Sequence, residues 1–434
     1  MTHAFIPQCY AIDFGTTNSL LAAASVDAVH APIALDPLAG DPTILRSVLY
    51  FPDATHCHFG ADALAQYVAQ GMQGRLMRSV KKFLPSRSFV GTYVEERPLN
   101  LEDLIAALLS EMRRRANAFF SVDVKRVVLG RPARFSADDG DDRYAQQRLE
   151  RAARLAGFGD VAFCPEPIAA ARDFRGTLEQ PRTVLVGDFG GGTSDFTVMR
   201  MRKEGYDPAD VLAIGGVPVA GDAFDGAIMR HHVSRHLGSE VQYRVPMGHN
   251  VLTMPPALME KLCTPADASL LRSQDALTFL RNVRAWSLGP DDRHCMDQLF
   301  TFVEDRLGFA VFESIEAAKR ALSNAEQARV RFSYPTVEID EPLTRTGFEH
   351  SSRSKTEAIV AELDATLARA DLSPEQIEIV CCTGGTARLP ALADALATRF
   401  GREKLTEFRS FHSVIHGLAE HARSWLRGEG VGQA

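Results

Sequence analysis

Two segments of the chain repeat one polar sequence after an apolar run. The first reads Asp13-Phe-Gly15-Thr16-Thr17-Asn18-Ser19, and the second reads Asp188-Phe-Gly190-Gly191-Gly192-Thr193-Ser194-Asp195. Glycines and small hydroxyl residues let backbone N–H groups approach phosphate oxygens closely. The aspartate that follows each apolar run can hold Mg²⁺ through water, because Mg²⁺ prefers few carboxylates and keeps much of its hydration shell. Two such segments together predict a site that grips one polyphosphate from both sides.

Each copy has the pattern of a β-hairpin, in which a tight turn joins two apolar strands. The two aspartates lie about one domain's length apart, so we expect one hairpin in each of two lobes. Either segment alone is equally well an ordinary hairpin with a glycine turn, and it is the repetition that favours a phosphate site. The sequence contains no GxxxxGK[ST] P-loop, no dinucleotide fingerprint and no His-Arg-Asp kinase loop.

A third turn of the same kind follows the apolar strand predicted at 377–382. Its residues are Gly384, Gly385, Thr386 and Arg388, and a helix is predicted from Pro390 to Phe400. A Gly-Gly turn lets the backbone lie flat against a planar ring or a ribose, although many α/β proteins have such turns.

A helix is also predicted around residues 311–323. Its apolar face comprises Val311, Ile315, Ala318 and Leu322, and its opposite face comprises Glu316, Lys319, Arg320 and Ser323. A solvated surface explains such a polar stripe. The alternative is that the guanidinium group stacks on adenine while its neighbours bond the base and ribose.

The composition excludes some classes of protein. The formal net charge of −7 argues against general binding to nucleic acid, and no apolar run is long enough to cross a bilayer. The seven cysteines are scattered without a CxxC pair, and the N-terminus lacks the pattern of a signal peptide. We therefore expect a cytoplasmic protein with no membrane segment and no nucleic-acid partner.

Taken together, these segments resemble the nucleotide-binding domain of the Hsp70 family. The two Asp-Phe-Gly segments are similar to that domain's phosphate loops. Further matches follow in the family's order: Val80-Lys81-Lys82-Phe83, Glu166-Pro-Ile-Ala-Ala-Ala171, Gly221-Asp222-Ala-Phe224-Asp225, Glu316-x-x-Lys319-Arg320-x-Leu322-Ser323 and Gly384-Gly385-Thr386-x-Arg388-x-Pro390.

The resemblance implies an α/β, actin-like ATPase (ribonuclease H-like) fold with two lobes, each a mixed sheet flanked by helices. Lobe I would span residues 1–182 and carry the first hairpin. Lobe II would span 183–405, with the second hairpin, the adenosine site and an inserted helical region at about 236–307. Residues 406–434 would return to lobe I.

The resemblance also assigns roles to residues. Asp13 and Asp188 would place Mg²⁺ through water, with K⁺ sites accompanying it, and Lys81, Glu166, Thr193 and Asp195 would position the attacking water and the γ-phosphate. The residues expected to contact ATP or ADP are Gly15, Thr16, Thr17, Asn18, Gly190, Gly191, Gly192, Gly221, Asp222, Glu316, Lys319, Arg320, Ser323, Gly384, Gly385, Thr386 and Arg388. The implied function is slow ATP hydrolysis, in which nucleotide-dependent lobe closure signals to a protein partner, as in a chaperone.

The sequence departs from the family in several places. Little chain follows Gly417, so we expect no peptide-binding domain, as in the short Hsp70-like proteins of the YegD type. The arginine expected after Pro132 is missing, with Gln146 nearest, and an expected acidic residue is replaced near Phe411-His412. The insertion at 236–307 is the expected partner surface. Two alternatives stay open: a small-molecule kinase that uses Asp195 or Asp222, and a nucleotide-binding scaffold without turnover.

Overall fold

The computed structural model describes residues 5–71, 73–136, 138–175, 178–203, 208–264, 268–407 and 412–429. The chain forms two compact units. The first comprises residues 1–218, 360–387 and 394–434, and the second comprises 219–359 and 388–393. Both large sheets lie in the first unit. The expected lobes would place one sheet in each lobe, so the two units are not the expected lobes. The division into lobes stays a prediction.

The first sheet is buried on both faces because its central strand alternates between two cores. Tyr10 and Ile12 pack into one hydrophobic cluster, whereas Cys9 and Ala11 pack into another on the opposite face. The strand order is β11-β10-β1-β2-β3, and β4 also pairs with β2. The strands are β1 (Cys9–Phe14), β2 (Asn18–Ala24), β3 (Val29–His30), β4 (Leu45–Arg46), β10 (Arg126–Arg131) and β11 (Asp160–Pro165).

The second sheet repeats the topology of the first. Its order is β14-β13-β12-β19-β20. In each sheet the first strand of the antiparallel hairpin, β1 or β12, also pairs in parallel with a strand from later in the chain, β10 or β19. That strand in turn pairs in parallel with the edge strand, β11 or β20. The strands are β12 (Arg182–Phe189), β13 (Ser194–Met201), β14 (Val211–Val217), β19 (Ile379–Thr383) and β20 (Leu405–Glu407). The repeat read from two short motifs thus extends to the order of whole sheets.

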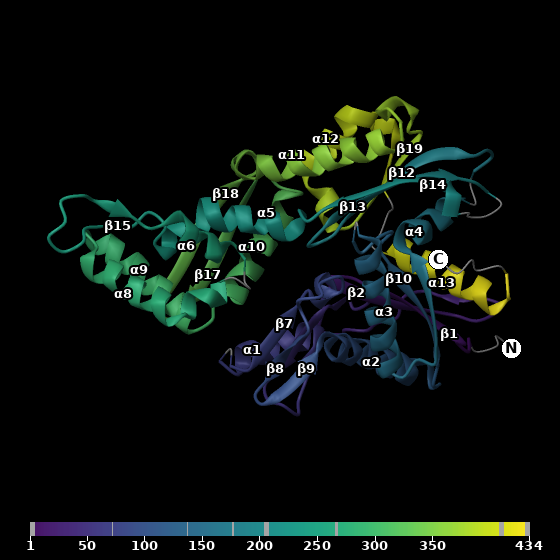
Figure 1. Cartoon of the computed structure of the whole chain (residues 1–434), viewed down its shortest axis with the longest axis horizontal. Helices are drawn as coiled ribbons and strands as arrows, with labels where there is room; N and C mark the ends of the chain where they lie inside the picture. The colour runs from purple at the N-terminus through teal and green to yellow at the C-terminus, as the bar shows by residue number, and fades with distance from the viewer. Residues whose placement is uncertain are drawn as a thin grey trace. The chain divides into compact units, whose positions relative to one another are not determined.

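Helices cover the sheets of the first unit (Figure 1). The helices that begin and end in this unit are α1 (Gly60–Ala69), α2 (Leu101–Phe120), α3 (Asp139–Leu155), α4 (Glu166–Arg175) and α13 (His412–Leu426). Helices α2 and α3 contribute to the core on one face of the first sheet, and α13 contributes to the core on the other face. A Cβ placed on Gly417 of α13 would lie 1.9 Å from the backbone oxygen of Ala169 in α4. Only glycine permits this close crossing of the two helices.

Shorter elements complete the first unit. They are β5 (Val48–Phe51), β6 (His58–Phe59), β7 (Arg75–Arg78), β8 (Gly91–Val94), β9 (Arg97–Asn100) and the 3₁₀ turns at Val80–Phe83, Pro208–Asp210, Pro374–Gln376 and Arg402–Lys404. The 3₁₀ turn at Gly385–Arg388 has residues in both units. Helices α11 (Arg345–Arg369) and α12 (Pro390–Phe400) each have residues in both units. The helix predicted from Pro390 to Phe400 is confirmed, and the strand predicted at 377–382 begins two residues later.

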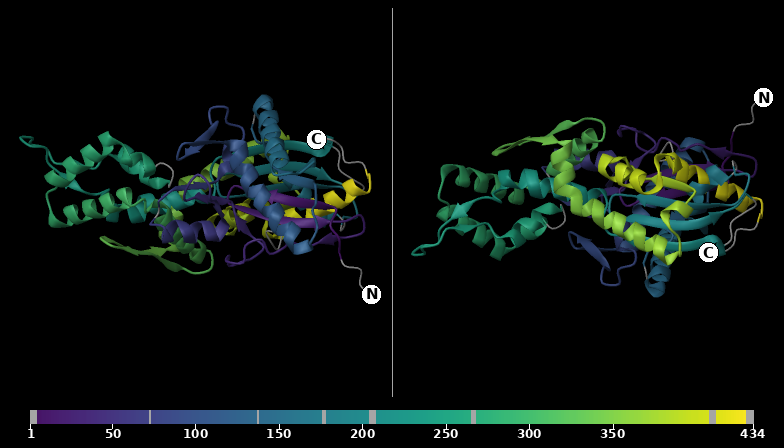
Figure 2. Two further views of the ribbon diagram at one scale, coloured as in Figure 1. Left: turned by 90° about the horizontal axis from the view of Figure 1, so that it is seen from below. Right: turned by 90° about the horizontal axis from the view of Figure 1, so that it is seen from above.

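The second unit is mainly helical. Its helices are α5 (Gly221–Ile228), α6 (Pro256–Glu260), α8 (Gln274–Trp286), α9 (Pro290–Glu304) and α10 (Gly308–Leu322), with a π-helical turn at Met229–Val233 and 3₁₀ turns at Ser234–Leu237, Lys261–Cys263 and Ser269–Arg272. Helices α8 and α9 lie side by side (Figure 2). The strands form two hairpins, β15 (Gln242–Tyr243) with β16 (Leu252–Thr253) and β17 (Gln327–Tyr334) with β18 (Val337–Thr344).

Candidate functional site

The turns of the two predicted hairpins have matching geometry. Phe14 pairs with Ser19 in the first hairpin, and Phe189 pairs with Ser194 in the second. The turns also lie near each other, because a Cβ placed on Gly192 would be 3.7 Å from Cγ2 of Thr16. The structure therefore brings together two segments that are far apart in the sequence, within one compact unit.

Residues 45–47 brace the first turn. The hydroxyl of Ser47 donates to the backbone oxygen of Gly15 at 2.8 Å, and its backbone N–H donates to the oxygen of Thr17 at 2.8 Å. The buried hydroxyl oxygen of Thr17 has no hydrogen-bond partner in the part of the chain that is described. A buried hydroxyl without a partner costs free energy, so a polar ligand that supplied a partner would be favoured at this turn.

The third turn is joined to the second hairpin. Asp188 and Thr383 are register partners in parallel strands, and the Thr383 hydroxyl donates to Oδ1 of Asp188 at 2.8 Å. The Thr386 hydroxyl donates to the backbone oxygen of Gly190 at 2.8 Å. Gly384 has a φ of +86°, and a Cβ there would lie 2.2 Å from the oxygen of Phe189. Glycine is therefore required where the third turn meets the second hairpin.

An acidic cluster lies beside these turns and contains one lysine. Lys81 Nζ donates to Oε1 of Glu166 at 2.8 Å, and the two side chains are only 10% and 11% exposed. Asp13, Asp188 and Asp195 are close enough to this pair for their charges to act on one another. We call Asp13, Lys81, Glu166, Asp188 and Asp195 the acidic cluster. Its elements are β1, the 3₁₀ turn at Val80–Phe83, α4, β12 and β13.

The pKa values of the aspartates reflect this crowding. Burial raises the pKa of Asp188 to about 6, and the charge of Glu166 adds to the shift, while Thr383 and Lys81 oppose it. Burial raises the pKa of Asp195 to about 7 despite the hydrogen bond that it accepts from Thr193 at 2.8 Å. Burial and then Glu166 raise the pKa of Asp13. Burial is the largest cause of all three shifts, and the neighbouring carboxylates act in the same direction.

The ammonium group of Lys81 has the opposite shift. Burial acts to lower its pKa, but the charges of Glu166, Asp13 and Asp188 and the hydrogen bond to Glu166 together raise it. Lys81 is therefore held in its charged form at the centre of the cluster.

The donor set fits a divalent cation that is held through water. In the described ranges, no three His, Cys, Asp or Glu side chains are arranged to hold a metal ion directly. Carboxylates with raised pKa values nevertheless favour a cation nearby, and Mg²⁺ binds through its own water molecules where few carboxylates reach it. The prediction that Asp13 and Asp188 would place Mg²⁺ through water stays a prediction.

The other predicted site residues lie in the second unit. They are Gly221, Asp222, Glu316, Lys319, Arg320, Ser323 and Arg388. Lys319 Nζ donates to the backbone oxygen of Gly221 at 3.0 Å and to Oδ2 of Asp225 at 2.9 Å, so it links α10 to α5. Their joining with the acidic cluster into one nucleotide site stays a prediction.

The sequence predicted one apolar and one polar face for helix α10, and the structure describes the burial of both. Val311, Ile315, Ala318 and Leu322 are buried, which confirms the predicted apolar face. On the opposite face Arg320 is 65% exposed, but Lys319 is only 11% exposed and pairs with Asp225. The interpretation of this stripe as a simply solvated face is therefore wrong for Lys319.

Sequence reasoning assigned no role to Thr383, Asp225 or Ser47, although each contacts a predicted site residue. Asp225 is buried, and burial raises its pKa to about 6 while Lys319 opposes the shift. Asp225 lies in the segment Gly221-Asp222-Ala-Phe224-Asp225 that resembles the family, and this resemblance is the signal that could have found it. Thr383 and Ser47 depend on strand pairings that the sequence does not reveal.

Two residues stand at positions where the sequence departs from the family pattern, and each contacts a nearby side chain. Gln146 accepts a hydrogen bond from Arg131, whose guanidinium group also pairs with Asp142 at 2.9 Å. Phe411 lies outside the described residues, but His412 Nε2 is 2.9 Å from the hydroxyl of Thr43.

Comparison with known proteins gives the class of protein to which this site belongs. A family model described as "Hsp70 protein" matches residues 58–244 and 306–427. These residues are well over half of the chain, so the chain belongs to the Hsp70 family, and its mixed α/β fold agrees with that family.

Individual relatives are distant in sequence. The chain is 24% identical over 431 residues to chaperone protein DnaK of Thermosipho melanesiensis, which covers 97% of this chain and 60% of that protein. It is 27% identical over 332 residues to heat shock 70 kDa protein BIP3 of Oryza sativa subsp. japonica, covering 75% of this chain and 40% of that protein. A chaperone protein HscA homolog of Bordetella petrii is 26% identical over 428 residues, covering 95% of this chain and 57% of that protein. The chain thus spans about 40 to 60% of the length of these relatives. Among the described residues, no helix is long and apolar enough to cross a membrane.

Proposed function

We propose that the chain binds ATP with Mg²⁺ between two actin-like lobes and hydrolyses it slowly in the cytoplasm. Nucleotide-dependent closure of the lobes would signal to a protein partner. The observation that carries this proposal is the acidic cluster, in which four carboxylates and one lysine lie beside two glycine-rich turns. Membership in the Hsp70 family supports the same function.

The excess of negative charge explains why Mg²⁺ suits the site. When bound, Mg²⁺ would neutralise the charge of the phosphates and polarise the terminal phosphoryl group. Asp13 and Asp188 would hold it through water molecules, and the hydrogen bond from Thr383 fixes the orientation of the Asp188 carboxylate. K⁺ can add to this neutralisation.

The remaining groups of the cluster would position the reacting water. Lys81 is charged and held by Glu166, so its ammonium group would bind a γ-phosphate oxygen. Asp195 has a pKa of about 7 and is oriented by Thr193, so it would accept a proton from the attacking water near neutral pH. The Thr17 hydroxyl would donate to a phosphate oxygen. No covalent intermediate on the protein is needed, because positioning and charge neutralisation suffice for phosphoryl transfer.

The test is single-turnover hydrolysis of labelled ATP with Mg²⁺ and K⁺. We expect slow release of phosphate without any acceptor, and its loss in Lys81→Ala and Asp188→Ala. Lys82→Ala is the matched control for the lysine, because Lys82 is exposed and lies next to Lys81 in the sequence. Binding of ATP without phosphate release would leave a scaffold, and turnover only with an acceptor would indicate a small-molecule kinase.

A partner surface in the second unit would receive the signal. Residues 245–305 lie outside the ranges matched by the family model. This stretch carries many of the exposed large apolar side chains: Val245, Met247, Val251, Leu252, Leu270 and Leu288. Exposed apolar side chains are typical of protein-binding surfaces. A photo-crosslinking residue at Met247 should capture a partner in a nucleotide-dependent yield, whereas one at exposed Leu38 should not.

A further inference from the structure

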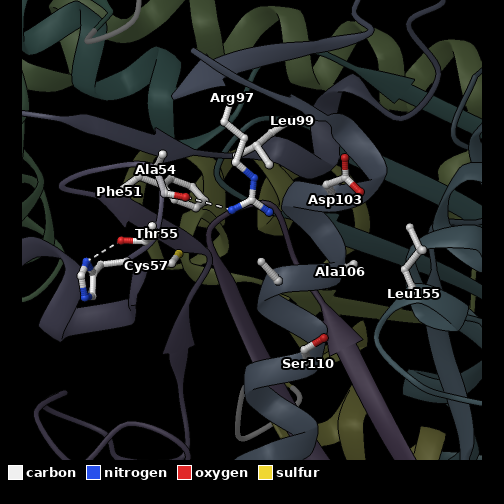
Figure 3. A pocket seen from close by; sticks show the side chains of 12 residues that line it. Phe51, Ala54, Thr55, Cys57, Arg97, Leu99, Asp103, Ala106, Ser110 and Leu155 are labelled. Atoms are coloured by element: carbon white, nitrogen blue, oxygen red, sulfur yellow. Dashed lines mark hydrogen bonds between the residues drawn. The ribbon is translucent and has the colours of Figure 1, made fainter. Parts of the chain in front are cut away.

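A pocket of about 340 Å³ lies in the first unit and shares no residue with the acidic cluster (Figure 3). Its walls come from the β5–β6 connection, from β9 and from α2. Pockets of this size hold small organic molecules, especially where apolar walls are combined with a few polar groups.

One face of helix α2 forms a wall of the pocket. Asp103, Ala106, Ala107 and Ser110 all line it. Their spacing of three, four and seven residues from Asp103 places them on one face of the helix, and Figure 3 shows Asp103, Ala106 and Ser110 in succession along it. The space exists because the two middle positions are alanines.

The floor of the pocket is apolar. Phe51, Leu99 and Ala106 are each only 7% exposed and belong to the hydrophobic core of this unit. Cys57 also lines the pocket, and burial raises the pKa of its thiol to about 12. The thiol therefore stays protonated and is an apolar wall rather than a nucleophile.

Two opposite charges lie at the rim. Arg97 Nη1 donates to the backbone oxygen of Ala54 at 2.9 Å, and Oδ2 of Asp103 accepts the backbone N–H of Asn100 at 2.9 Å. Neither charged side chain forms an ion pair with any described residue. Each hydrogen bond fixes one side chain and leaves its other polar atoms for a ligand.

We propose that this pocket binds a small zwitterion with an apolar body, namely a free α-amino acid with an apolar side chain. Arg97 receives the carboxylate, Asp103 receives the ammonium group, and the side chain lies on the floor of Phe51 and Leu99. A simple anion would leave Asp103 and the apolar floor unused, and an uncharged apolar molecule would leave both charges unused. This inference is independent of ATP hydrolysis.

The test is direct binding to the full chain, by calorimetry or saturation-transfer NMR, with phenylalanine and leucine as probes. Each is compared with analogues that carry one charge: 3-phenylpropanoate without the ammonium group and 2-phenylethylamine without the carboxylate. We expect saturable binding of an amino acid, and at least about tenfold weaker binding of each analogue, because each analogue lacks one of the two charged groups that the pocket would bind.

Three variants test whether the ligand binds in this pocket. Arg97→Gln and Asp103→Asn should each weaken binding about tenfold or more, and Ala107→Leu should abolish it by filling the space. Arg353→Gln is the control, because Arg353 is exposed and lies in the second unit. Unchanged thermal unfolding of Arg97→Gln, at an exposed position, would show that its loss of binding is not a loss of folding.

The inference is overturned if no amino acid binds saturably, or if a singly charged analogue binds as tightly as the zwitterion. Binding that is unchanged in both Arg97→Gln and Ala107→Leu would also overturn it, because the ligand would then lie elsewhere.

Discussion

Replacement of Asp195 by asparagine should make the nucleotide-free protein more stable while it removes activity. Asp195 lies in a cluster that already holds Asp188 and Glu166, and burial raises its pKa from 3.8 to about 7. Asparagine has nearly the same shape, and its side-chain oxygen can still accept the hydrogen bond from Thr193. The substitution therefore removes mainly a charge that the folded protein disfavours.

The magnitude follows from the pKa shift. One pKa unit corresponds to about 1.4 kcal/mol, so the shift corresponds to about 4 kcal/mol as an upper limit. Neighbouring carboxylates titrate together and water reaches part of the cluster, so we expect a gain of about 1–3 kcal/mol in the free energy of unfolding at pH 8.

The sign of the pH dependence provides a second check. The pKa of Asp195 is higher in the folded state than in the unfolded state, so the folded protein binds this proton more tightly. Its contribution to the free energy of unfolding therefore falls as pH rises from about 4 to about 7 and stays low above that range. The stability advantage of Asp195→Asn should accordingly shrink between pH 8 and pH 5.

The assay is urea unfolding followed by circular dichroism at pH 5, 7 and 8 without nucleotide. Asp27→Asn at an exposed position serves as the control for loss of one carboxylate. The reasoning is refuted if Asp195→Asn is no more stable than the wild type at pH 8, or if the difference in stability does not depend on pH.

Three further predictions concern the contacts around the site. Gly417→Ala should destabilise the protein by about 2–4 kcal/mol in urea unfolding, because its Cβ would collide with the α4 backbone, whereas Gly159→Ala meets open space and should be nearly neutral. Thr383→Val removes a hydrogen bond that opposes the raised pKa of the carboxylate it contacts. The acidic limb of the pH–rate profile for ATP hydrolysis should therefore move to higher pH by about one unit, and an unmoved limb would contradict this role. Lys319→Met leaves the buried carboxylate of Asp225 without its partner and should lower the free energy of unfolding by about 3 kcal/mol. The double variant Lys319→Met with Asp225→Leu should recover much of this loss in a double-mutant cycle.

The two hairpin turns and the third turn could be predicted from the sequence. Each turn combines glycines and hydroxyl residues after an apolar strand, and the repetition of this pattern made the two hairpins and the third turn recognisable as motifs. Their strands and turns lie where the sequence indicated, with Asp13 and Asp188 at the ends of β1 and β12. Local chemistry was sufficient here, because each hairpin is closed by neighbours in the chain.

Contacts between distant segments could not be predicted in the same way. The insertion at about 236–307 was expected to be helical, but its helices are interrupted. A 3₁₀ turn precedes α8, and the side chain of Ser273 accepts the backbone N–H of Ala276 where α8 begins. The burial of Lys319 depends on Asp225 in another helix. Helical spacing shows which residues share a face, but it does not show what that face packs against.

The sequence by itself determined the strands, the turns and the family to which this chain belongs, because these depend on residue types at short spacing. The tertiary structure alone decided which charges meet. Asp13, Lys81, Glu166, Asp188 and Asp195 come from five separate elements. The raised pKa values of the three aspartates exist only because folding buries them. Electrostatic interaction depends on distance in space and on exclusion of water, and neither quantity is written in the order of residues along the chain.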